Sequence, residues 1–270
     1  MADALTTNSH AARESRSDRN GDGLAYRITY AIPPVLIAAL VCTYFISPAF
    51  YLEYVLAEQQ REYQAVELIT VLSALLGSML MLTASYRLWR GSGPVDTGVA
   101  GWRTGRGGAA IIALLMLATF FFAGEEANWG QTYFAGPTSV AEIGATNLHN
   151  TISLPVQSLG SVFLIVMFFG LPIAWAFRRL LALPEAWAPA IAEGPVIFCM
   201  ACAFAWKIVK SVYVLMLAGE AKQDRVYMQF IEQINEQKEM LVAVALLLYG
   251  LFRLCAVARS LSVPDASARS

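Results

Sequence analysis

Residues 109–131, AAIIALLMLATFFFAGEEANWGQ, decide the fold class of this chain. The first sixteen of them carry no charge, and the adjacent acids Glu125 and Glu126 follow directly. An apolar run of about 20 helical residues matches the ~30 Å hydrocarbon core of a bilayer. We therefore expect a membrane-spanning helix here, and the two carboxylates raise the question of what makes their charge tolerable.

Similar apolar blocks recur along the chain. Of its 270 residues, 57% are hydrophobic and 14% are charged, whereas about a quarter of the residues of a soluble domain are charged. The sequence predicts an all-α, polytopic membrane helix bundle over residues 28–258, between polar tails, 1–27 and 259–270, that we expect to be disordered. The six predicted spans are approximately 28–51, 64–88, 109–131, 152–177, 195–218 and 240–258.

The prolines of these blocks bear on helix continuity. Pro33, Pro34, Pro48 and Pro172 are expected to kink or end their helices, because proline lacks the backbone N–H that continues a helix. The first block is too long for the core of a signal peptide, so we interpret it as a retained span.

The distribution of Lys and Arg predicts the orientation. With the N-terminus inside, the cytoplasmic segments hold thirteen of these residues and the outer segments hold four. Cytoplasmic loops of membrane proteins are enriched in Lys and Arg. Both termini are therefore predicted to be cytoplasmic, in a plasma or inner membrane. The net charge of -1 gives no indication of nucleic-acid binding.

Acids and a lone histidine gather at the predicted outer face. Glu125 lies ~24 Å along the third span if that span begins at Ala109. The loop that follows the span ends in NLHN, 147–150, and its His149 is the only histidine outside the N-terminal tail. Glu232 and Glu236 lie one turn apart in a helical stretch, 226–244, that leads into the sixth span.

Two lysines lie inside the fifth span. Lys207 and Lys210 are three residues apart, so they share one helix face. A lysine in the middle of a span needs a partner. We expect a Glu–Lys pairing between the third and fifth spans, with Glu67 of the second span at a comparable depth.

These residues form a predicted site, and each has a structural alternative. We assign the catalytic role to Glu125, Glu126 and His149, and substrate binding to Lys207, Lys210, Asn128, Gln131, Asn147 and Asn150. The candidate ligands of a divalent metal ion are Glu125, His149, Glu232 and Glu236. The alternatives are interhelical contacts for the paired acids, a helix cap for the histidine, ion pairs for the lysines and a solvated face for the later glutamates.

The combination of GEEANWGQ with NLHN resembles an uncharacterised family of bacterial multi-pass membrane proteins with the pattern GEExxWGQ followed by NLHN. The resemblance covers mainly 124–150 and implies no activity. The chain is also superficially similar to alkaline-ceramidase-like membrane hydrolases, whose polar motifs surround a metal. That family uses several histidines, and this chain offers one.

Three functions remain open at this point. The first is a membrane-embedded enzyme that acts on a lipid or lipid-linked substrate, such as a lipid hydrolase. The second is a non-catalytic accessory or assembly subunit. The third is an ion-coupled transporter, which the sequence disfavours because the cytoplasmic half shows no comparable polar cluster.

Overall fold

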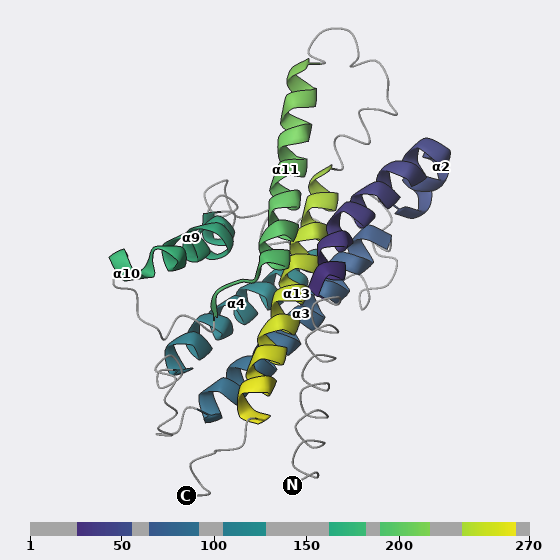
Figure 1. Cartoon of the computed structure of the whole chain (residues 1–270). Helices are drawn as coiled ribbons and strands as arrows, with labels where there is room; N and C mark the ends of the chain where they lie inside the picture. The colour runs from purple at the N-terminus through teal and green to yellow at the C-terminus, as the bar shows by residue number, and fades with distance from the viewer. Residues whose placement is uncertain are drawn as a thin grey trace, which may run out of the picture.

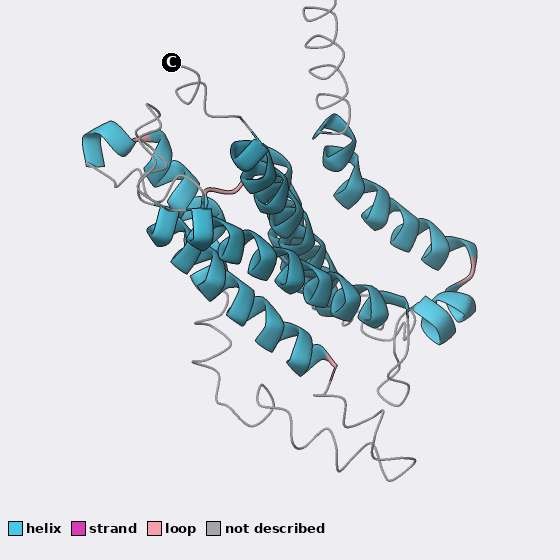
Figure 2. Cartoon of the chain, turned by 90° about the horizontal axis from the view of Figure 1, so that it is seen from below, coloured by secondary structure: helices cyan, strands magenta, loops and turns pink. Residues whose placement is uncertain are grey.

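The computed structural model describes residues 26–55, 65–91, 105–127, 162–181, 190–216 and 234–262. All regular structure in these ranges is helical, without a strand (Figures 1 and 2), so the all-α prediction is confirmed. The long helices are Tyr26–Ile46, α3 (Ala65–Gly91), α4 (Gly105–Glu126), α11 (Gly194–Met216) and α13 (Ile234–Ser262). The short elements are α2 (Pro48–Phe50), α9 (Leu171–Ala176), α10 (Arg178–Leu181) and the π-helices η1 (Tyr51–Val55) and η3 (Val166–Gly170).

Five of these helices are long and apolar enough to cross a membrane. Their lengths and compositions suit a multi-pass membrane protein. The described part of the fourth predicted span is the apolar helix Val162–Ala176. Its length is ~22 Å, which is less than a ~30 Å core. Residues 152–161 of that span lie outside the described ranges, so the count of six crossings stays a prediction.

The bundle is organised around α3 and α13. α13 packs along α3 and on its other side against α11, while α4 packs against α3 (Figure 1). α3 and α13 touch at two glycines, Gly77 of α3 and Gly250 of α13. A Cβ added to Gly77 would lie 3.1 Å from the backbone of Leu246 and Leu247. Glycine lets two helix backbones approach this closely, which is the usual way for helices to associate in lipid.

The contacts at the helix ends fix the direction in which each helix runs. α13 starts at Ile234, where Gln237 contacts Tyr51 of η1, and Phe252 near its other end meets the ring of Tyr26. Ser85, late in α3, donates a hydrogen bond to the carbonyl oxygen of Ala109, early in α4 (2.8 Å). Gly77 and Leu80 of α3 lie against Leu246 and Gly250 of α13, in the same order, so α3 and α13 run in one direction and helix Tyr26–Ile46 and α4 run in the opposite direction. α11 also runs opposite to α13, because its Trp206 meets Gln237 and its start lies beside Arg253.

Prolines and caps set several of the helix limits. Ser47 caps α2 by accepting a hydrogen bond from the backbone N–H of Phe50, and Pro48 occupies the first turn. The first helix therefore ends at Ile46 instead of continuing to residue 51. Pro172 lies directly after the π-helix η3, where the helix is irregular, as predicted. In contrast, helix Tyr26–Ile46 does not end at Pro33 and Pro34 but continues through them.

Candidate functional site

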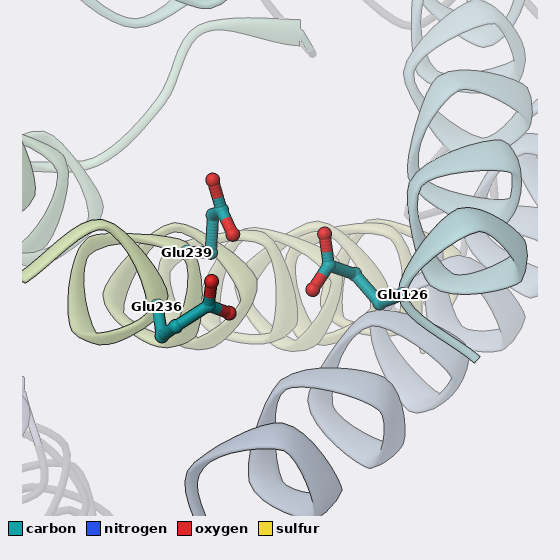
Figure 3. Close-up of side chains that lie close together, drawn as sticks. All are labelled: Glu126, Glu236 and Glu239. Atoms are coloured by element: carbon teal, nitrogen blue, oxygen red, sulfur yellow. The ribbon is translucent and has the colours of Figure 1, made fainter. Parts of the chain in front are cut away.

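Three carboxylates meet at the end of the bundle where α4 ends and α13 begins. Oxygens of Glu126, Glu236 and Glu239 all lie within 4.8 Å of one another (Figure 3). We call these three residues the carboxylate cluster. Glu126 is the last residue of α4, and the other two lie in the first two turns of α13. The cluster thus joins segments separated by more than one hundred residues in the chain.

Glu126 is the member best suited to hold a proton. Burial raises the pKa of its carboxyl group well above the ordinary value, and the charges of Glu239, Glu236 and Glu67 raise it further. Lys238 opposes this shift. Glu126 also lies at the C-terminal end of its helix, where the macrodipole disfavours a negative charge, whereas Glu67 and Glu236 lie in favourable first turns.

The acids lie at the end of the apolar span and not inside it. The stretch of α4 that could cross a membrane ends at Gly124, and α4 itself ends at Glu126; residues 128–131 of the predicted span lie outside the described ranges. The acids thus lie just beyond the candidate span, where charge costs less because polar groups and water are within reach. The depth of Glu125 along the predicted span stays a prediction.

A hydrogen-bonded amide supports the first turn of α13 beside the cluster. Gln237 is 0% exposed. Its Oε1 accepts a hydrogen bond from Nε1 of Trp206 in α11 (2.5 Å), and its Nε2 donates to the hydroxyl of Tyr51 (2.5 Å). Burial raises the pKa of Tyr51, so this hydroxyl stays neutral. One side chain therefore ties three segments together at this level.

Lys238 is the cation that the structure places at the cluster. Its Nζ lies 3.2 Å from Oε1 of Glu239. Lys207, which we expected to pair with an acid inside the bundle, is exposed, because at this level of α11 the inward position belongs to Trp206. Lys210 is part-buried. A role of the two α11 lysines in substrate binding remains a prediction.

Of the predicted site residues, the structure brings Glu126 and Glu236 together. Glu125 belongs to α4, but its side chain is outside the described part of the chain. The roles assigned to these acids remain predictions. The remaining predicted residues also lie outside the described ranges: Asn128, Gln131, Asn147, His149, Asn150 and Glu232.

A buried ion pair occupies the opposite end of the bundle. Arg253 of α13, 6% exposed, pairs with Glu193, which directly precedes α11. Its guanidinium group also lies over the ring of Tyr249 (5.6 Å to the centroid), whose hydroxyl donates to the carbonyl oxygen of Ala190 (2.9 Å). This pair was not among the predicted site residues, and the absence of a polar cluster from the cytoplasmic half stays a prediction. The signal was an arginine inside the apolar run LLLYGLFRLCAV, 246–257.

The chemistry open to the carboxylate cluster follows from its donor set. Three carboxylates offer only oxygen ligands, which suit hard divalent ions such as Mg²⁺, Ca²⁺ and Mn²⁺. The same group can instead share a proton, because closely spaced carboxylates do not all ionise readily. Either a cation or a proton would relieve the repulsion among these acids.

Comparison with known proteins supplies no relative for this site. No family model matches the chain, and neither a curated protein nor a solved structure is significantly similar to it. The resemblance to the GEExxWGQ family therefore rests on the two motifs alone.

Proposed function

We propose that this is a six-span membrane enzyme that uses the carboxylate cluster, at the extracytoplasmic face, on a lipid or lipid-linked substrate. The observation that carries the proposal is the convergence of Glu126, Glu236 and Glu239 within 4.8 Å at the edge of a membrane span. Each further element of the proposal has its own support.

Chain direction supports six crossings. α4 and α11 run the same way, so the chain between Ala127 and Gly194 has to return from one end of the bundle to the other. The apolar helix Val162–Ala176 lies in this interval, and its Phe168 packs edge-on against Tyr249 of α13 (5.7 Å). We infer that this segment, extended by preceding residues, is the sixth crossing.

The basic residues support an extracytoplasmic position for the cluster. The helix ends remote from the cluster carry a set of arginines that is typical of a cytoplasmic face. These are Arg27, Arg87, Arg90, Arg106, Arg253 and Arg259. We infer that both termini are cytoplasmic.

The proposed reaction is the hydrolysis of an ester or phosphoester bond by water. Glu126 would accept a proton from the attacking water and return it to the leaving oxygen, a role that requires a pKa near the working pH. Its upward pKa shift is in the direction that this role requires. Glu236 and Glu239 would bind a divalent ion that polarises the substrate oxygen. His149, Asn147, Asn150 and the lysines of α11 remain candidates for substrate contacts.

The test uses the full-length protein in lipid nanodiscs containing total membrane lipids. We expect the wild type to convert at least one lipid class in the presence of Mn²⁺, as measured by mass spectrometry, and Glu126→Gln to be inactive. Thr119→Val is the control, because among the described residues the buried hydroxyl of Thr119 donates within its own helix, to the carbonyl oxygen of Leu115 (2.7 Å). If no lipid changes, or if Glu126→Gln stays active, the enzyme proposal is wrong.

The ion pair at the other end favours an ion-coupled transporter as the second candidate. A carrier needs charge-bearing groups on both sides of its barrier, and Arg253 with Glu193 provides the second set. In this case Mn²⁺ or proton flux into sealed proteoliposomes should depend on both Glu126 and Arg253. Ion flux without lipid turnover would support the transporter. If neither flux nor lipid turnover is observed, the non-catalytic accessory subunit is the function that is left.

A further inference from the structure

Gln237 stands out in the polar first turns of α13 because its side chain is fully buried, whereas the neighbouring Glu236 and Lys238 are exposed or part-buried. The rest of the helix that follows it is almost entirely buried hydrophobic surface, from Met240 to Tyr249. A buried amide without hydrogen-bond partners destabilises the folded state. The two bonds of 2.5 Å, from Trp206 and to Tyr51, satisfy both ends of the side chain.

These two bonds fix the rotation of α13 about its axis. Successive residues of a helix are about 100° apart around its axis. Seen down the axis and measured from Gln237 in the same rotational direction, Glu236 lies at about 100° and Glu239 at about 160°. The two acids are thus about 60° apart on the side of α13 that faces away from the amide. While Trp206 and Tyr51 hold the amide, both carboxylates are directed toward the end of α4.

The position of the second partner adds to this constraint. Tyr51 opens the π-helix η1, and its ring packs edge-on against Tyr44 of the first helix (5.4 Å). Tyr51 is itself 0% exposed, so it cannot follow α13 if that helix turns. π-helical segments occur frequently at functional sites, where they place a side chain that a regular helix would not.

We propose that Gln237 is the positioning residue of the carboxylate cluster: held by Trp206 and Tyr51, it sets the rotation of α13 that brings Glu236 and Glu239 to Glu126. The inference rests on the proposed function, because it assigns the hydrogen bonds a role in ligand binding at that site. If the amide only stabilised the core, its loss would lower stability and leave the site unchanged.

The experiment measures Mn²⁺ binding to the full-length protein in nanodiscs by the electron paramagnetic resonance signal of free Mn²⁺. We expect Gln237→Leu to weaken binding about tenfold, and Trp206→Phe or Tyr51→Phe about fivefold, since one net hydrogen bond corresponds to roughly that factor. Gln237→Leu combined with Trp206→Phe should be no weaker than Gln237→Leu alone, because both remove the same bond.

The matched control is Ser85→Ala. It removes a buried interhelical hydrogen bond (2.8 Å, to Ala109) far from the cluster and should lower stability without changing Mn²⁺ affinity. Folding of each variant is verified by circular dichroism. If the wild type binds no Mn²⁺, or Glu236→Gln binds it as well as the wild type, the proposed metal site fails, and the positioning role fails with it. If the wild type binds and Glu236→Gln does not, but Gln237→Leu binds normally, only the positioning role is overturned.

Discussion

Replacing Gly250 by alanine tests the contact between α3 and α13 on which the bundle depends. The added Cβ would lie 2.8 Å from the carbonyl oxygen of Gly77 and 3.0 Å from Cβ of Leu80. Neither atom can rotate away, so the two helices have to separate. Overpacking of this kind costs about 1–3 kcal/mol, and the better helix propensity of alanine returns up to about 1 kcal/mol. With the full offset, we expect Gly250→Ala to lower the free energy of unfolding by up to about 2 kcal/mol.

The matched control is Gly170→Ala in η3. An added Cβ there would meet its nearest atom, Cγ1 of Val166, at 3.9 Å, which is ordinary contact. This variant should be unchanged or more stable by up to about 1 kcal/mol. The assay is SDS-induced unfolding of the full chain in mixed micelles, followed by circular dichroism. If Gly250→Ala is as stable as Gly170→Ala, the close packing of α3 on α13 is refuted.

Three further predictions concern charge and topology. Arg253→Met and Glu193→Gln should each lower the free energy of unfolding by about 3 kcal/mol. This is the low end for breaking a buried ion pair, because the Glu193 side chain is 25% exposed. If the two losses are additive in a double-mutant cycle measured by the same unfolding assay, the pairing is contradicted. The raised pKa of Glu126 means that the folded state binds the extra proton, so stability should fall as pH rises from the ordinary carboxyl pKa through the raised one. Glu126→Gln should remove that slope from unfolding curves recorded across pH, and an unchanged slope would assign it to another group. Fluorescent protein fused before Tyr26 or after Ser262 should fluoresce in the cytoplasm in both cases, whereas opposite results for the two fusions would rule out an even number of crossings.

The fold class could be predicted because a bilayer imposes a length on every span. α3 and α11 therefore begin and end within a few residues of the predicted blocks 64–88 and 195–218. The sequence predicts a sixth span from residue 240 with a helical stretch, 226–244, leading into it, and α13 is one helix from Ile234 to Ser262. The sequence did not predict that the amide of Gln237 in its first turns is buried.

The site could be predicted only in part, because composition does not fix helix rotation. Glu126 and Glu236 were named from their position at one end of the bundle. Glu239 was not included, although it lies three residues from Glu236 and therefore on the same helix face. The sequence did not identify Lys238 or Gln237 as site residues. Contacts between helices that are distant in the chain depend on which side chains pack against each other, and a single sequence contains little information about this packing.

α13 connects the two charged regions of this protein. Glu239 and Arg253 are separated by ~21 Å along one helix that contains no proline and is buried for most of this length. A tightly packed helix of this kind moves as a unit rather than bending, because its neighbours leave no room for a local change. Any shift of its first turn when a cation or proton binds would therefore be transmitted to the Glu193–Arg253 pair. An enzyme with a one-sided site does not require that pair to open, whereas a carrier does, so the response of the pair to events at the cluster is a property that separates the two candidate functions.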